Sequence, residues 1–222
     1  MAVEIRTENL RKTYKSGENE VVALDDVTVN IKASDMVAVT GTSGAGKSTL
    51  LHLLGSLDVP SSGTVYYGEQ DIYQWKEKEL AKFRCKQVGF VYQFFNLIPE
   101  LSAWENIILP CTLAKEKPDK AYLENLCEEL QLTDRLGHLP AELSGGQQQR
   151  VAIVRALANQ PEVLLCDEPT GNLDRESTKE VMKVLNLVHE KYKQSIVIVT
   201  HDMEVASQCS RNIQISDGRI VE

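Results

Sequence analysis

Residues 41–48 form a glycine-rich loop that ends in lysine and serine, and this loop constrains the fold more than any other feature. It directly follows a short, largely apolar run at residues 36–40. It leads into residues 47–57, whose leucines recur with helical spacing. We expect a buried parallel strand, a phosphate-binding loop and a helix, in that order. The loop consists of Gly41, Thr42, Ser43, Gly44, Ala45, Gly46, Lys47 and Ser48.

Such a loop binds a nucleoside triphosphate mainly through its backbone. Glycines let successive N–H groups point at phosphate oxygens, and the helix adds the positive end of its dipole. We expect Lys47 to reach the β- and γ-phosphates, Ser48 to ligate Mg²⁺, and Thr49 to join the ATP contacts. The alternative, a chance glycine turn, would occur in about one chain in a hundred of this length.

A second candidate element is the apolar strand at residues 163–167, which ends in two carboxylates. Asp167 can hold the metal of a Mg²⁺–nucleotide site, and Glu168 can act as a general base on the attacking water. Acidic residues at strand ends also occur for structural reasons alone. The phosphate-binding loop upstream is what favours the metal-site interpretation.

A third element is the start of an amphipathic helix at residues 144–150. Ser144 is a plausible N-cap, and Gly145 and Gly146 follow it. This helix start is a second anion-binding terminus, although one nucleotide already has its phosphates in the first loop. We infer that the second terminus serves a nucleotide held by another copy of the chain. The alternative is an ordinary capped helix.

Together the three elements resemble the ATP-binding cassette (ABC) ATPases. Residues 143–147, Leu-Ser-Gly-Gly-Gln, are similar to the signature motif of that family, which adds Gln147 to the expected ATP-contacting residues. The resemblance covers essentially the whole chain. It implies an ATPase that binds ATP and Mg²⁺ and forms an ATP-dependent, head-to-tail homodimer.

Four further roles come only from the resemblance. Tyr14 matches the aromatic residue that stacks on adenine, and Gln93 matches the Q-loop glutamine, a ligand of Mg²⁺ that touches the attacking water. Asp174 lies in residues 171–174, which match the D-loop that crosses to the second copy. His201 matches the catalytic switch histidine at the γ-phosphate. Without the family, Tyr14 would suit packing and His201 an ordinary strand end.

The implied fold is α/β, a P-loop NTPase of the ABC ATPase type. It has a mixed, mostly parallel sheet, an N-terminal antiparallel β subdomain and a helical subdomain, within one nucleotide-binding domain at residues 1–222. The residues themselves predict a helical insert from 71 to about 140, divided into short pieces by Pro110 and Pro118. With the Q-loop and signature motif, the helical subdomain extends over about 71–159. Predicted strands are 23–31, 36–40, 64–67, 163–167, 195–200, 212–216 and 219–221, and predicted helices are 47–57, 76–86, 120–130, 145–159, 176–192 and 203–207.

Composition argues against a nucleic-acid-binding protein, a disulfide-rich protein and a membrane-spanning protein. The net charge is −8, so no nucleic-acid partner is expected. The five cysteines include no CxxC pair, which favours reduced thiols in a cytoplasmic protein. We expect no signal peptide, and no apolar run approaches the ~20 residues that a membrane-spanning helix needs.

The apolar segment at residues 94–104 directly follows Gln93. We expect it to form part of a groove for a short helix of an integral membrane permease, which would hold the chain at the inner face of the cell membrane. The alternative is that Phe94, Phe95 and Trp104 are subdomain core. Residues 97–99, 105–106, 147–150 and 168–174 resemble one branch of the family, with lipoprotein-release, macrolide or peptide-export and cell-division ATPases. Export or extraction of peptide, lipoprotein or drug-like cargo is therefore expected, and a non-transporting ATPase of the cell-division type is the alternative.

Overall fold

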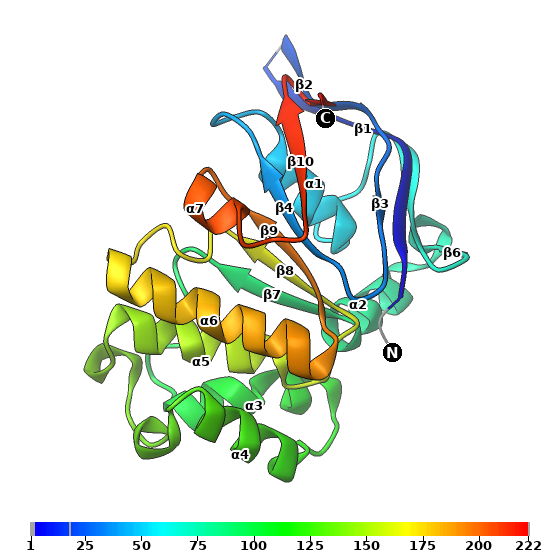
Figure 1. Cartoon of the computed structure of the whole chain (residues 1–222). Helices are drawn as coiled ribbons and strands as arrows, with labels where there is room; N and C mark the ends of the chain where they lie inside the picture. The colour runs from blue at the N-terminus through cyan, green and yellow to red at the C-terminus, as the bar shows by residue number, and fades with distance from the viewer. Residues whose placement is uncertain (1–2, 18, 222) are drawn as a thin grey trace.

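The computed structural model describes residues 3–17 and 19–221 and is built around a six-stranded sheet (Figure 1). Its strand order is β11-β10-β4-β9-β8-β7. All neighbouring pairs are parallel except β10 with β11. The strands are β4 (Met36–Thr40), β7 (Val88–Tyr92), β8 (Val163–Asp167), β9 (Ser195–Val199), β10 (Arg211–Ser216) and β11 (Arg219–Ile220).

The two faces of this sheet belong to two different hydrophobic cores. Along β8, Leu164 and Cys166 pack into one core, whereas Val163 and Leu165 pack into the other. Burial on both faces explains why the central strands are almost continuously apolar. The strands predicted at 36–40 and 163–167 are confirmed, and the predicted strand at 195–200 ends one residue earlier.

A second, antiparallel sheet covers one face of the first. It joins β2 (Asn19–Val27), β1 (Ile5–Ser16), β5 (Ser62–Tyr67) and β6 (Gln70–Asp71), with β3 (Asn30–Ile31) paired to β1. The continuous strand predicted at residues 23–31 is wrong, because strand β2 ends at Val27 and a separate strand, β3, begins at Asn30. Asp26 has a φ of +57°, and the two pieces pair with different parts of β1. Val27, Val29 and Ile31 are nevertheless all buried, so alternate residues of this stretch still face the core.

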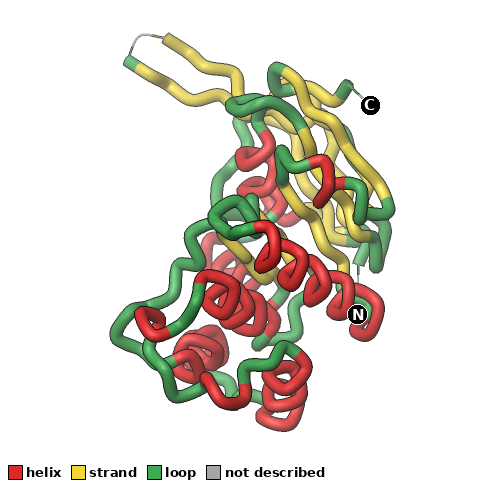
Figure 2. Tube along the Cα trace, turned by 60° about the vertical axis from the view of Figure 1, so that its left-hand side comes forward, coloured by secondary structure: helices red, strands yellow, loops and turns green. Residues whose placement is uncertain are grey.

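Most helices gather at one end of the molecule, as Figure 2 shows, and they divide between the two cores. The larger core takes side chains from α3 (Ala103–Ala114), α4 (Lys120–Glu129), α5 (Gly145–Leu157) and α6 (Arg175–Tyr192). The core under the antiparallel sheet takes them from α1 (Lys47–Leu54) and α2 (Glu77–Lys86). The short α7 (Met203–Ala206) follows β9.

Most predicted helices match the structure to within two residues, but Pro110 and the end of the first helix do not follow the prediction. Pro110 does not divide a helix, because α3 continues through it. Ile107 and Cys111 on either side are buried in the larger core, so tertiary packing outweighs the local cost of a proline in a helix, about 3 kcal/mol. The helix predicted to reach residue 57 ends at Leu54, because Gly55 caps it and Ser56 has a φ of +54°.

The five cysteines form no disulfide in the structure. All five are free thiols, and Cys111, Cys127 and Cys166 are buried. Among the described residues, none of the helices combines the length and the apolar character required to cross a membrane.

Candidate functional site

The phosphate-binding loop opens a cavity of about 400 Å³ at the carboxyl ends of the central strands. The loop follows β4, while Glu168 follows β8 and His201 lies just beyond β9, so neighbouring parallel strands deliver these side chains to one edge. Gln93, directly after β7, also contributes. The cavity is lined by Ala23, Ser43, Gly44, Gly46, Lys47, Ser48, Thr49, Gln93, Glu168 and His201.

Two glycines of the loop have no room for a side chain. Gly46 has a φ of +105°, and a Cβ there would lie 2.3 Å from the carbonyl oxygen of Ala23. Gly41 has a φ of +150°, and its Cβ would lie 2.1 Å from the carbonyl oxygen of Ile215. The loop is therefore folded tightly against β2 and β10, with its backbone free to face the cavity.

Lys47 is buried at the base of this loop. Its Nζ donates to the carbonyl oxygens of Gly41 at 2.8 Å and Thr42 at 2.9 Å. The ammonium group is thus held beneath the loop where phosphate oxygens would lie. A positive charge at this position can attract an anion held by the loop.

Ser48 lines the cavity and is hydrogen-bonded to Asp167, the last residue of β8. The Ser48 hydroxyl donates to Oδ1 of Asp167 at 3.0 Å. Burial raises the pKa of Asp167, and the hydrogen bond from Ser48 lowers it in part. A partly desolvated carboxylate of this kind gains from a nearby cation. Within the described part of the chain, no cluster of three or more His, Cys, Asp or Glu side chains could hold a metal by itself.

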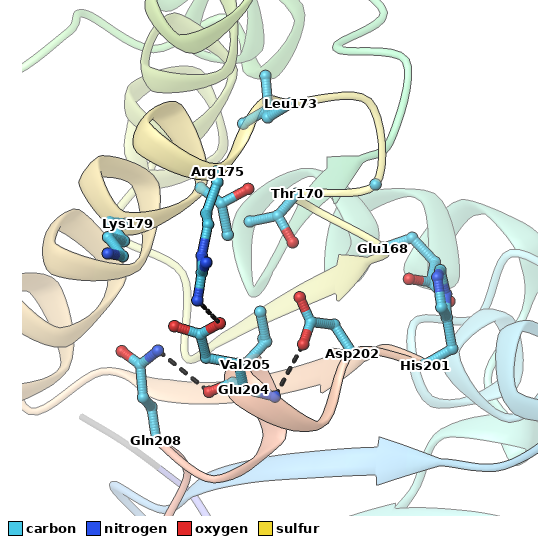
Figure 3. A pocket seen from close by; sticks show the side chains of 12 residues that line it. Glu168, Thr170, Leu173, Arg175, Lys179, His201, Asp202, Glu204, Val205 and Gln208 are labelled. Atoms are coloured by element: carbon cyan, nitrogen blue, oxygen red, sulfur yellow. Dashed lines mark hydrogen bonds and ion pairs between the residues drawn. The ribbon is translucent and has the colours of Figure 1, made fainter.

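Glu168 and His201 form a direct pair. Nδ1 of His201 lies 2.9 Å from Oε1 of Glu168, and Figure 3 shows the two side chains next to each other at the end of their strands. Glu168 has a φ of +47°, and its N–H donates to the carbonyl oxygen of Val199 at 2.9 Å. This left-handed backbone is uncommon for a residue with a side chain. The carboxylate can both pair with an imidazole and accept a proton.

A second cavity, of about 370 Å³, shares Glu168 and His201 with the first. Figure 3 shows Arg175 at the start of α6 reaching toward Glu204 of α7 across it, and the two side chains are 3.4 Å apart. Thr170 and Leu173 contribute from the loop after β8. The loop at residues 171–174 therefore borders the Glu168–His201 pair.

The signature-motif residues lie outside both cavities. Ser144 caps α5, accepting a hydrogen bond from the Gln147 N–H at 3.3 Å, while the Ser144 N–H donates to Oε1 of Gln147 at 2.9 Å. Asp174 caps α6 in the same way, accepting from the N–H groups of Glu176 and Ser177. Ser144, Gly145, Gly146, Gln147 and Asp174 are thus not brought to the phosphate-binding loop of their own chain.

Tyr14 also lies outside the phosphate cavity. Its hydroxyl donates to Oδ2 of Asp58 at 2.8 Å, and Nζ of Lys12 lies 4.9 Å from the ring centroid. Burial and the Asp58 contact raise the pKa of Tyr14, whereas a hydrogen bond with Thr49 lowers it. Tyr14 is 39% exposed, so part of its ring could stack on a base.

The apolar segment after Gln93 is divided between surface and core. Phe94 is 73% exposed, whereas Trp104 is partly buried against the larger core. The turn between them is held from α5, because the Arg155 guanidinium donates to the carbonyl oxygens of Phe95 at 2.7 Å and Asn96 at 2.5 Å. Trp104 therefore packs against the subdomain core, whereas Phe94 does not; the partner groove stays a prediction.

Some features of the site could not be seen in the sequence. A cavity of about 740 Å³ lies between α2 and the end of α3, lined by Lys76, Lys78, Glu79, Ala81, Lys82, Cys85, Lys86, Leu113 and Ala114. The charged pattern of residues 76–86 predicted a helix but gave no sign of a cavity. The buried Gln149 joins α5 to two strand ends, donating to the carbonyl oxygens of Pro169 at 2.5 Å and Tyr92 at 3.3 Å.

Comparison with known proteins agrees with this geometry. A family model described as ABC transporter matches residues 24–171. Over 216 residues the chain is 44% identical to the lipoprotein-releasing system ATP-binding protein LolD of Idiomarina loihiensis, covering 96% of this chain and 95% of that protein. It is 46% identical over 220 residues to the macrolide export ATP-binding/permease protein MacB 2 of Aeromonas hydrophila, covering 98% of this chain and 34% of that longer protein. A dimeric ATP-binding cassette solved in a post-hydrolysis state with ADP and Pi matches with a TM-score of 0.88 at 40% identity, covering 98% of this chain and 97% of that one.

Proposed function

The chain belongs to the ABC transporter family, and from this premise we propose that two copies of it close around ATP and drive a separate membrane protein. As a member of that family it is an ATPase. The observation that carries the proposal is the single cavity that collects the phosphate-binding loop, Glu168 and His201 at one edge of the sheet.

ATP with Mg²⁺ fits the residues present. Lys47 and the loop N–H groups would bind the phosphates, and Ser48 with Asp167 would offer one hydroxyl and one carboxylate to a metal. Such a sparse set suits Mg²⁺, which usually completes its coordination with phosphate oxygens and water. Bound there, the metal would neutralise charge on the phosphates, with Gln93 as a further ligand. Tyr14 would stack on adenine.

Hydrolysis would rest on this chain's own acid–base groups. Glu168 acts as general base toward the attacking water, since its carboxylate lies at the cavity wall. His201, paired with Glu168 in the structure, can turn toward the γ-phosphate, because 72% of its side chain is exposed. The backbone of the phosphate loop and Lys47 stabilise the charge that develops on the transferred group.

The second half of each site would come from another copy. The capped start of α5 presents N–H groups that the chain's own cavity does not use. ATP would lie between the phosphate-binding loop of one copy and Ser144, Gly145 and Gly146 of the other. Asp174 would lie where the loop at residues 171–174 contacts the second copy. ATP then favours the closed dimer, and hydrolysis favours the open one.

The membrane partner would dock on residues 76–114. Phe94 supplies an exposed aromatic anchor, and the cavity between α2 and α3 supplies an apolar surface with Leu113 at 70% exposure. The cavity rim carries four lysines and one glutamate, which favours a short helix with acidic side chains. This docking would hold the chain at the inner face of the cell membrane.

The cargo is proposed from the relatives. LolD belongs to a lipoprotein-releasing system, and MacB 2 is a macrolide exporter. We therefore favour export or extraction of lipoprotein, peptide or drug-like molecules. The relatives favour this class over a non-transporting ATPase of the cell-division type.

Detergent extraction of cells that express the tagged chain tests the proposal. With Mg-ATP, the Glu168→Gln chain should co-purify with a protein that has several membrane-spanning segments. Phe94→Asp added to the Glu168→Gln chain should abolish this co-purification, whereas Val221→Asp, exposed on another part of the surface, should leave it intact. Phe94→Asp alone should keep ATP hydrolysis. Recovery of the partner with Phe94→Asp would contradict the assigned surface, and recovery of none with any variant would contradict the membrane role.

A further inference from the structure

Gln93 and Asn172 form a reciprocal pair of amides that joins the ends of two loops. Nε2 of Gln93 donates to Oδ1 of Asn172 at 3.0 Å, and Nδ2 of Asn172 donates to the main-chain carbonyl oxygen of Gln93 at 3.1 Å. Gln93 follows β7, and Asn172 belongs to the loop after β8. The pair links the residue proposed as a metal ligand to the loop proposed to reach the second copy.

This pair also determines which atom of the Gln93 side-chain amide, Nε2 or Oε1, has no hydrogen-bond partner. A carboxamide has one donor end and one acceptor end, and the hydrogen-bond network determines its orientation. Because Asn172 uses its NH₂ group on the Gln93 main chain, it presents Oδ1 to the Gln93 side chain. That acceptor must meet Nε2, so Oε1 of Gln93 is left without a donor among the described residues. Oxygen is the atom that Mg²⁺ binds.

Gly171 leaves the space that this arrangement needs. A Cβ at that position would lie 2.8 Å from Nε2 and 3.1 Å from Cδ of Gln93. Gly171 does not have a positive φ, so the requirement is one of space and not of backbone conformation. An added methyl group would displace the flexible end of Gln93 and separate it from Asn172.

We propose that Asn172 is a positioning residue that holds the Gln93 amide with its oxygen available to the metal of the nucleotide site. This inference rests on the proposed Mg-ATP site and adds to it a residue of the loop that follows the general base. The loop at residues 171–174 thereby sets the metal affinity of its own chain as well as contacting the second copy.

The test is a Mg²⁺ titration of fluorescent ATP-analogue binding to the purified full chain, with Glu168→Gln present throughout so that no hydrolysis occurs. Asn172→Ala should raise the half-saturating Mg²⁺ concentration by about two- to tenfold, the range expected for losing one or two hydrogen bonds. Gly171→Ala should shift it in the same direction. Asn186→Ala is the matched control, because its Nδ2 donates to Oε1 of Gln208 at 3.3 Å outside the nucleotide cavity, and it should cause no shift.

A second titration separates positioning from a general structural effect. In a chain that also carries Gln93→Ala, the Asn172→Ala substitution should change the Mg²⁺ dependence no further. An unchanged titration for Asn172→Ala alone, or an equal shift in the Gln93→Ala chain, would overturn the inference and leave the metal site standing. Binding that is independent of Mg²⁺ in the Glu168→Gln parent would overturn the metal site and the inference together.

Discussion

Nδ1 of His201 and Oε1 of Glu168 lie 2.9 Å apart although the residues are 33 positions apart in the chain. They meet because β8 and β9 are parallel neighbours, with Asp167 paired to Val199 at their carboxyl ends. The phosphate-binding loop leaves the adjacent strand β4 at the same edge. Sheet topology therefore brings together the groups to which we assign hydrolysis, and the proposed mechanism can be tested at each of them.

Replacing Glu168 with glutamine should separate binding from hydrolysis. The amide keeps the size of the side chain but cannot accept the proton of the attacking water, so phosphate release should fall by about 10²–10⁴-fold. ATP affinity should stay close to that of the native chain, because the loop and Lys47 are untouched. Phosphate release and equilibrium ATP binding measure the two effects, and turnover at the native rate would refute the role of Glu168.

Lys47→Ala should act on binding itself. The buried ammonium group would no longer offer charge-assisted hydrogen bonds to phosphate, a loss of about 1.5–3 kcal/mol, or about 10–100-fold in ATP affinity. Calorimetric titration with ATP measures it. Lys183→Ala, an exposed lysine on α6, serves as the control and should bind ATP normally. Equal affinity for both variants would contradict the position assigned to the triphosphate.

Alanine substitutions at three glycines should lower the melting temperature to different extents, according to the φ angle of each glycine and the space around it. Gly137 has open space and no positive φ, Gly44 has open space with a φ of +79°, and Gly46 has both a positive φ and backbone 2.3 Å from its Cβ. The melting temperature should be near native for Gly137→Ala, lower for Gly44→Ala, and lowest for Gly46→Ala, which combines strain of about 1–3 kcal/mol with a steric clash. Any other order would contradict the packing of the loop on β2.

Asp167→Asn should stabilise the nucleotide-free chain at neutral pH. Burial raises the pKa of Asp167, so the folded chain holds this proton more tightly than the unfolded chain. Protonated Asp167 contributes to the folding stability below the ordinary pKa of an aspartate, about 3.9. That contribution is lost as the pH rises through the raised pKa that Asp167 has in the folded chain. Asparagine avoids that loss and still accepts the Ser48 hydrogen bond, so its melting temperature at pH 7 should be higher by a few degrees.

Thermal unfolding of both chains without nucleotide, from pH 4 to pH 8, checks this prediction. The difference should shrink as the pH falls toward about 4, where the unfolded aspartate begins to protonate as well. A difference that is the same at every pH, or a lower melting temperature for Asp167→Asn at pH 7, would exclude burial of the charge as its cause.

The sequence was most informative where a motif coincides with the end of a strand. Gly46, Lys47 and Glu168 were placed from local patterns alone, because apolar runs that end in glycine or carboxylate identify the functional edge of a parallel sheet. Local periodicity could not foresee that α3 runs through Pro110, since the burial of Ile107 and Cys111 that permits it depends on distant segments.

Contacts between loops escaped prediction for a similar reason. The Gln93–Asn172 pair and the Tyr14–Asp58 hydrogen bond join positions 79 and 44 residues apart, and both partners are common polar residues without a distinctive spacing. The cavity between α2 and α3 likewise depends on how two helices approach each other. Only the folded arrangement reveals these relationships.

The central claim is that each ATP site is completed by a second copy of the chain. Light scattering of the purified Glu168→Gln chain with Mg-ATP measures this directly, with the same chain carrying Ser144→Arg as the control. We predict twice the molecular mass of the chain with ATP and a single chain without it, and a single chain in both conditions once Ser144 is replaced. A Glu168→Gln chain that binds ATP with native affinity yet keeps the mass of one chain would contradict the account.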